Sequence, residues 1–301
     1  MKYYFYIKTL GFVLLAVIIG ACNKDEVAEK WAKEEAELKA WINENAPNAI
    51  FENGIYFEII RSKSENNIKP ESDDHVLVNF VCSFIDGVVE QVSFKSGQTN
   101  HKPLYLSDYK EGGPELWPSD YWSKMGIEHM RENDIANIYI PSRVLGLQDF
   151  KSRKYEMELV RVIENLKNYQ EDLMSRYMEK NFRKNFNTDT ILINGREHVI
   201  FFHINNKNAG DEEIDIASVR TRYDEYYFLE DNDRKLCVQN QLKIGWDKKF
   251  SEMFKSVKKG AEITAMMPYR VMHGEEPYMN ANKQFIAPLG SVLKYEIKID
   301  P

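Results

Sequence analysis

The sequence has few cysteines, few prolines and no excess of basic residues, and these shortages exclude several classes of protein. Its 301 residues include three cysteines, whereas a disulfide framework needs an even, dense set. Lysine and arginine number 40 against 47 aspartate and glutamate residues, which gives a formal charge of −7. That balance argues against a general nucleic-acid binder, because phosphate contacts need a basic surface.

Motifs for several common chemistries are also missing. The sequence has no glycine-rich phosphate loop, no His-Glu-x-x-His and no Cys-x-x-Cys. His198 and His203 lie five residues apart in a strand-like run, so they are expected on opposite faces and unable to chelate one metal. We therefore expect no metal, no cofactor and no hydrolase triad.

The residues that are abundant favour a folded, β-rich chain. Hydrophobic residues make up 43% and aromatic residues 13%, with 15 glycines and 10 prolines. This composition excludes a disordered chain and favours strands, which tyrosine and phenylalanine prefer. The length is sufficient for two domains of ordinary size.

The N-terminal segment resembles the signal of a bacterial lipoprotein. Lys2 and Lys8 precede an apolar run of about twelve residues that ends at Ala21. A membrane span needs roughly 20 residues, so the run suits a signal-peptide core better. Cys22 follows Ile-Gly-Ala, which resembles a lipobox, although a plain secretory signal with an incidental cysteine is the alternative.

The lipobox resemblance implies cleavage of residues 1–21 and acylation of Cys22, which would anchor the chain to a membrane. The implied location is the bacterial cell envelope, as an outer-membrane lipoprotein. The tetrad at residues 23–26, Asn-Lys-Asp-Glu, is similar to the acidic signal that sends some Bacteroidota lipoproteins to the cell surface.

The same order of predicted elements occurs twice. A predicted helix over residues 27–45 precedes a hairpin signal at Asn53-Gly54, and a second predicted helix from Leu166 to Phe186 precedes Asn194-Gly195. Asn53 and Asn194 are 141 positions apart, and Tyr155 and Tyr295 are 140 apart. Two landmarks at one period indicate a tandem duplication.

The lipobox resemblance and the duplication together predict five segments. They are a signal peptide at 1–21, a lipid-anchored helical lead at 22–48, a first domain at 49–165, a linker helix at 166–187 and a second domain at 188–301.

An ordered set of motifs lies inside each repeat. The first has a hydrophobic strand at 76–80, an Asp-Gly turn at 86–87, a strand at 135–140 that runs into Pro-Ser, and a closing strand at 155–162. The second has Ile-Gly-Trp at 244–246 opening a short helix, Met-Pro at 267–268, Ile-Ala-Pro at 286–288 and a last strand at 292–299.

These sets resemble the FKBP-type peptidyl-prolyl cis-trans isomerases, over roughly residues 50–163 and 188–300. The resemblance implies an α+β fold with two tandem domains. Each would be a bent antiparallel sheet packed on a short helix and preceded by an N-terminal helix and hairpin.

The resemblance also implies an aromatic pocket that takes a prolyl ring. In the second repeat the pocket would have Trp246 as its floor, with Tyr223 and Tyr295 on the strands, His273 and Ile286 in the flap and Asp233 as its acidic residue. The first repeat departs from this pattern, with Phe80, Leu104, Trp122, Leu145 and Tyr155 at the corresponding places. Glu90 and Gln91 replace an expected Phe-Asp pair there, and the flap is shortened.

Two functions follow from the resemblance. The first is a peptidyl-prolyl isomerase that acts on X–Pro bonds of envelope proteins, mainly through the second domain. The second is a non-catalytic peptide- or partner-binding lipoprotein with a chaperone-like role. The partners implied are proline-containing polypeptides and, through Cys22, a membrane. A purely structural alternative is that Tyr223, Trp246 and Tyr295 are core aromatics of a sheet.

Overall fold

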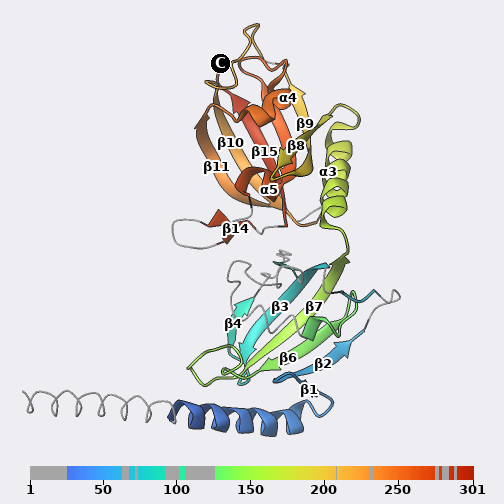
Figure 1. Ribbon diagram of the computed structural model, residues 1–301, viewed down its shortest axis with the longest axis vertical. Coiled ribbons are helices and arrows are strands. Elements are labelled where there is room, and N and C mark those ends of the chain that lie inside the picture. The colour runs from blue at the N-terminus through green and yellow to red at the C-terminus, as the bar shows by residue number, and fades with distance from the viewer. Residues whose placement is uncertain are drawn as a thin grey trace, which may run out of the picture. The chain divides into compact units, whose positions relative to one another are not determined.

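The computed structural model describes residues 26–62, 68–71, 74–92, 102–105, 126–207, 209–230, 234–274, 278–279, 285–287 and 290–301. The chain divides into two compact units, the first made of residues 1–71, 78–95 and 111–161 and the second of residues 72–77, 96–110 and 162–301. Figure 1 colours the chain from blue through green to red. In the described part, no helix combines the length and apolar character that a membrane crossing requires.

A helix over residues 26–45 precedes a seven-stranded sheet, most of which belongs to the first unit. Its strands run in the order β1-β2-β6-β7-β3-β4, with β5 paired to β3. The strands are β1 (Ile50–Glu52), β2 (Ile55–Arg61), β3 (His75–Phe84), β4 (Val89–Val92), β5 (Lys102–Tyr105), β6 (Ile135–Ile140) and β7 (Arg153–Ile163).

The second unit contains a six-stranded sheet with the order β8-β9-β12-β15-β10-β11. Its strands are β8 (Asn187–Ile193), β9 (Arg196–Asn205), β10 (Arg220–Phe228), β11 (Arg234–Ile244), β12 (Glu262–Pro268) and β15 (Val292–Ile299). Its helices are α3 (Leu166–Phe182), the 3₁₀ turn η2 (Lys248–Phe250), α4 (Ser251–Phe254) and α5 (Tyr269–His273). Strands β13 (Tyr278–Met279) and β14 (Phe285–Ala287) pair with each other.

The two sheets have the same strand order when each is followed from its first hairpin. In both hairpins the paired strands leave a two-residue turn, Asn53-Gly54 and Asn194-Gly195. Both asparagines have a φ of 50°, and the glycines have φ of 89° and 77°. Two positive φ values in succession fit a type I′ turn, whose twist matches that of the flanking strands. The α+β content and the repeated sheet order agree with the expected fold class.

A helix packs on one face of each sheet. Leu38 and Ile42 of the N-terminal helix contact Tyr139 of β6, and Met174 and Met178 of α3 contact Met266 of β12. Corresponding helix residues lie 136 positions apart: Glu34 and Gln170, Leu38 and Met174, Trp41 and Tyr177, Ile42 and Met178. Helix α3, expected as a linker, is therefore part of the core of the second unit.

The predicted helix over 166–186 is four residues too long. It ends at Phe182 because Arg183 adopts a φ of 55°, which a right-handed helix cannot accommodate. The next residues turn toward β8, and the Asn185 carbonyl oxygen lies 2.6 Å from Nδ1 of His203.

The segment over residues 126–134 begins as a helix but does not continue as one. Residues 126 and 127 are helical, and the chain then forms turns. Asn133 has a φ of 71°, and the Asp134 carboxylate accepts a hydrogen bond from the Arg131 backbone N–H at 2.8 Å. Side chains of this kind stabilise turns in competition with the helix.

Candidate functional site

Trp246 is held at the end of β11 by a tight backbone turn. The preceding Gly245 has a φ of 71°, and a Cβ there would lie 2.4 Å from the Ala217 carbonyl oxygen, so other residues are excluded. The Trp246 N–H donates to the Ile216 carbonyl at 2.8 Å. Its indole Nε1–H donates to Oγ1 of Thr221 at 3.1 Å, and 5% of the residue is exposed.

An aromatic cluster forms around this indole. The ring centroids of Tyr223 in β10 and Tyr295 in β15 each lie 6.4 Å from the centroid of the indole, with interplanar angles of 66° and 86°. The two tyrosine rings are 5.5 Å apart. Phe250 and Phe254 contact the indole at 5.5 and 5.3 Å. Edge-to-face arrangements of this kind are favourable because positive ring edges meet negative ring faces.

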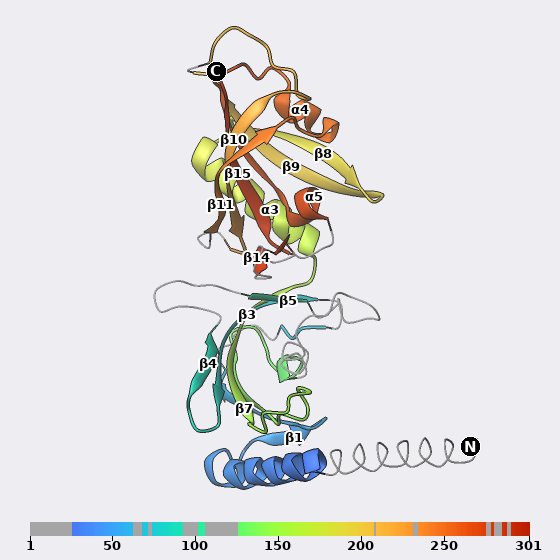
Figure 2. The same cartoon turned by 90° about the vertical axis from the view of Figure 1, so that its left-hand side faces the viewer.

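The cluster lies on the sheet face opposite α3. Glu225 is paired across the strands with Tyr295, and Tyr295 with Ala265, so these residues share one face with Tyr223. Met266, the next residue after Ala265, points to the other face and packs on α3. Figure 2 shows α3 and α4 on different sides of this sheet.

Glu225 adds a buried carboxylate to this face. It is 1% exposed, and Oε1 lies 2.9 Å from Nε2 of His273, whose side chain is 18% exposed. A buried carboxylate needs such a partner, because its desolvation is costly. Glu225 is not among the site residues expected from the sequence, although it stands two residues after Tyr223 and strand alternation places both on one face.

The Tyr295 hydroxyl is buried beside this carboxylate. Burial raises the pKa of Tyr295 well above its usual value, and the negative charge of Glu225 raises it further. Glu225 acts on the hydroxyl as an acceptor, but the contact lacks the geometry of a normal hydrogen bond. Among the described residues, no well-formed hydrogen bond reaches this oxygen.

Lys243 of β11 covers the Trp246 ring. Its ammonium lies 4.2 Å from the ring centroid. Burial lowers the pKa of Lys243, and the nearby charge of Lys249 lowers it further. The indole expected to be a pocket floor therefore carries a cation over its face.

The remaining predicted residues of the second repeat are placed less completely. Ile286 lies in β14, and its side chain is outside the described part. Asp233 is outside the described residues. The structure thus brings Tyr223, Trp246 and Tyr295 into direct contact, and His273 joins this set through Glu225.

The first unit has a smaller aromatic pair at the corresponding place. Phe80 and Tyr155 are buried, with their rings 5.9 Å apart. Cys82, two residues after Phe80, is buried too, and burial raises its pKa to about 11, which keeps the thiol protonated. Leu145 is buried. Leu104 lies in β5, with its side chain outside the described part, and Trp122 is outside the described residues.

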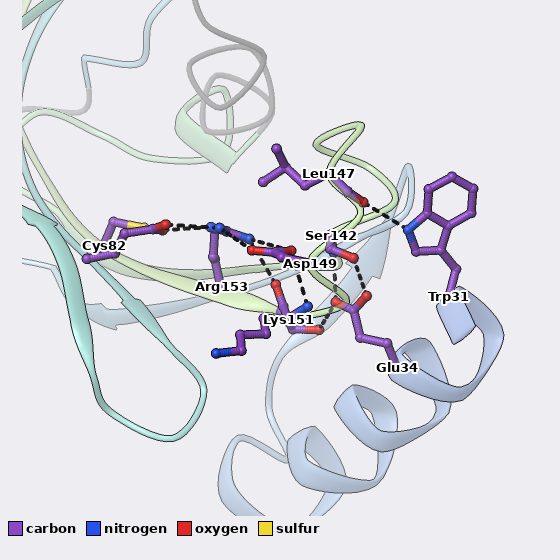
Figure 3. A network of polar contacts seen from close by, with 10 residues as sticks. Trp31, Glu34, Cys82, Ser142, Leu147, Asp149, Lys151 and Arg153 are labelled. Carbon is purple, nitrogen blue, oxygen red and sulfur yellow. Dashed lines mark hydrogen bonds and ion pairs between the residues drawn. The ribbon is translucent and has the colours of Figure 1, made fainter. Parts of the chain in front are cut away.

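A charged network lies beside this pair. Arg153 of β7 donates from Nε and Nη2 to the Glu90 carboxylate at 2.7 and 3.0 Å, and from Nη2 to Asp149 at 2.7 Å. Figure 3 shows Arg153 between Cys82 and Asp149. Burial alone would lower the pKa of Arg153, but these two carboxylates raise it above its usual value. The guanidinium also lies 5.0 Å from the Phe84 ring.

The N-terminal helix fixes the loop between β6 and β7. The Glu34 carboxylate, in a residue 5% exposed, accepts hydrogen bonds from the Ser142 N–H at 2.8 Å, from the Ser142 hydroxyl, and from the Ser152 hydroxyl at 2.7 Å. The Trp31 indole N–H donates to the Leu147 carbonyl at 3.0 Å. These contacts are visible in Figure 3.

In the described part, no group of three or more histidine, cysteine, aspartate and glutamate residues is arranged to hold a metal ion. Neither Cys82 nor Cys237 forms a disulfide within the described part.

Comparison with known proteins returns structural neighbours alone. No protein-family model matches the sequence, and no curated protein matches it. Among solved structures, FkpA from Escherichia coli has a TM-score of 0.36 at 16% identity, covering 46% of this chain and 64% of its own. The three FKBP domains of wheat FKBP73 have a TM-score of 0.29 at 13% identity, covering 83% of this chain and 94% of theirs.

A peptidyl-prolyl cis-trans isomerase from Pseudomonas syringae pv. tomato str. DC3000 has a TM-score of 0.34 at 16% identity, covering 45% of this chain and 95% of its own. This chain therefore spans less than two thirds of the E. coli structure. TM-scores below 0.5 do not assign a family.

Proposed function

We propose that the second unit binds proline-containing segments of polypeptides and catalyses cis–trans isomerisation of the X–Pro bond. The observation that carries this proposal is the meeting of Tyr223, Trp246 and Tyr295 on the sheet face opposite α3. Three rings from separate elements form an apolar cluster of the kind that a prolyl ring can contact, with Tyr223 as its most exposed member.

The reaction asks little of the protein in covalent terms. The barrier to rotation is about 18–20 kcal/mol and arises from amide resonance. A site that excludes water from the amide and contacts the twisted form better than either planar isomer lowers this barrier. The second unit supplies buried aromatic rings and, in Tyr295, a buried hydroxyl that a substrate carbonyl could accept from.

The site residues have distinct roles in this proposal. Trp246 is the floor for the prolyl ring, and Tyr223 and Tyr295 flank it. His273 and Ile286 belong to the flap, with His273 held by Glu225. Glu225 is an acidic residue of the site in addition to Asp233, which is expected from the sequence. The first unit is a degenerate counterpart with Phe80, Leu104, Trp122, Leu145 and Tyr155.

A second candidate is a binding module without catalysis. The ammonium of Lys243 over the Trp246 ring favours this candidate, because it occupies a surface that a prolyl ring needs. In this version the chain holds extended, proline-containing segments in a chaperone-like role.

Exchange spectroscopy on a capped Leu-Pro peptide separates the two candidates. We expect the purified protein to speed exchange between the isomers, and Trp246→Ala to remove most of the acceleration. The loss of a large aromatic side chain costs about 3–5 kcal/mol of stability, so folding of the variant is checked first. Trp122→Ala is the matched control in the first half and should leave the rate nearly intact. Absence of acceleration at high protein concentration contradicts the isomerase.

We further propose that the chain is a lipoprotein of the bacterial envelope. Its signal peptide would span residues 1–21, with a lipid-anchored lead at 22–48 and domains at 49–165 and 188–301. The lipobox-like sequence before Cys22 supports this; both lie outside the described residues. Cys22→Ala should abolish labelling by a palmitate analogue, and normal labelling of this variant contradicts the anchor.

A further inference from the structure

The ammonium of Lys243 has an unusual position on an acidic chain. It lies 4.2 Å from the centroid of the Trp246 ring, and no carboxylate of the described part lies within ion-pair distance of it. An aromatic face attracts a cation through its negative π surface. Lys243 itself is partly buried.

Each charged side chain near Lys243 is engaged in another contact. Lys249 is nearby, with Nζ donating to the Val271 carbonyl at 3.0 Å and lying 5.2 Å from the Phe250 ring. Asp247 and Glu225 also act on Lys243. Glu225, however, is paired with His273, and Asp247 caps η2 by accepting the Lys249 backbone N–H.

A peptide that stacks its proline on Trp246 has to displace this ammonium. The lysine then loses its contact with the ring, and a neutral peptide offers it nothing in return. An aspartate or glutamate beside the proline replaces the lost contact with an ion pair at the edge of the site. A lysine or arginine in that place adds repulsion.

We propose that Lys243 makes the aromatic site selective for prolyl segments with an acidic side chain next to the proline. This inference rests on the proposed function, since it concerns the substrates of the same site. Lys243 then has two separable effects. It lowers the affinity for every peptide that displaces its ammonium from Trp246, and it restores affinity for acidic peptides by forming an ion pair with them. The cation–π contact and an exposed ion pair are each worth little, so the preference is about threefold to tenfold.

The test uses three capped peptides that differ in one residue, Ala-Glu-Pro-Phe, Ala-Leu-Pro-Phe and Ala-Lys-Pro-Phe. Exchange rates and binding by NMR titration are measured with the wild-type protein, Lys243→Met and Lys243→Arg. The wild type should prefer Glu-Pro over Leu-Pro and Leu-Pro over Lys-Pro. Lys243→Met keeps the alkyl stem, removes the cost and should handle Leu-Pro better than the wild type while losing the preference. Lys243→Arg should retain it.

Lys255→Met is the matched control. Lys255 is exposed in the same unit, where it pairs with Glu252, and its change alters the net charge equally. The control should keep the wild-type order of peptides, and raised salt should weaken that order because exposed charges are screened.

The outcomes distinguish this inference from the proposed function. If the wild type speeds exchange but Lys243→Met keeps the order of peptides, the selectivity inference is wrong and the isomerase stands. If no peptide is accelerated but acidic peptides bind through Lys243, the isomerase is wrong and the selectivity stands. If none is accelerated and binding is indifferent to Lys243, both are wrong.

Discussion

The two halves of this chain contain sheets with the same strand order, but they carry different side chains on the face opposite the helix. In the second half that face carries the rings of Tyr223, Trp246 and Tyr295. In the first half, Phe80 and Tyr155 repeat one ring pair, and Arg153 with its carboxylates occupies the neighbouring positions. Arg153 precedes Tyr155 by two residues, whereas Leu293 precedes Tyr295 by two.

The opposite faces of the two sheets are more alike. Each is covered by a helix whose apolar residues repeat at one spacing. In each helix one buried polar side chain, Glu34 or Gln170, forms a hydrogen bond with the serine that directly precedes the last long strand, Ser152 before β7 or Ser291 before β15. The helix-covered face fixes the architecture, because its packing determines where the strands lie. The other face tolerates a charged network or an aromatic cluster on the same framework.

The largest expected effect concerns the two buried polar residues of the helices. Glu34→Ala removes the acceptor of a backbone N–H and two hydroxyls, and unsatisfied buried groups cost about 1–3 kcal/mol each. We expect a loss of about 2–4 kcal/mol in the free energy of unfolding. Gln170→Ala removes a donor to the Gly290 and Ser291 carbonyls and should cost about 1–2 kcal/mol. Urea unfolding measures both.

Glu35→Ala is the control for the first of these changes. Its carboxylate forms an exposed pair with Arg143 at 3.4 Å, and such pairs contribute about 0–1 kcal/mol. If Glu35→Ala costs as much as Glu34→Ala, the buried hydrogen bonds are not what holds the helix.

The sequence could predict elements whose signal is local. Asn53-Gly54 and Asn194-Gly195 indicate hairpins because few other residues adopt two positive φ values in succession. The ring cluster of the second half was predictable only through a family resemblance, since its members come from three separate elements. The pairing of Glu225 with His273 depends on long-range geometry. So does the salt bridge of Arg153, which joins residues 63 positions apart.

A middle-sized effect should come from giving the first half the residue of the second. Arg153→Leu leaves Glu90 and Asp149 without their partner, but both carboxylates are more than one third exposed, so water can solvate them. We expect a loss of about 1–2 kcal/mol at neutral pH.

The pH dependence of stability tests this prediction further. Hydrogen bonding to Arg153 lowers the pKa of Glu90 below its ordinary 4.5. Burial acts to raise the pKa of Asp149, but the same guanidinium outweighs it and holds the pKa below the ordinary 3.8. Lowered values stabilise the fold above the unfolded-state pKa, and this contribution is lost as the pH falls through the folded-state values. The difference in the free energy of unfolding between the wild type and Arg153→Leu should therefore become smaller as the pH falls from 7 into the acid range. An unchanged difference would show that the ion pairs of Arg153 do not stabilise the fold.

The smallest effect on stability, and the sharpest comparison, concerns the tyrosine that both halves share. Tyr155 interacts through its hydroxyl with the Cys82 thiol, so Tyr155→Phe should cost about 1 kcal/mol. The Tyr295 hydroxyl has no well-formed hydrogen bond within the described part, so Tyr295→Phe should change stability by less than about 0.5 kcal/mol. A buried donor with only a poorly formed contact to Glu225 has already lost its hydration, and a substrate carbonyl can accept from it at little further cost of that kind. Tyr295→Phe should accordingly slow peptide exchange several-fold while leaving the unfolding curve in place. Tyr155→Phe should lower the free energy of unfolding and leave the rate of peptide exchange unchanged. If Tyr295→Phe lowers stability and spares the rate, the hydroxyl serves the fold, and the two halves are more alike at this position than their surroundings indicate.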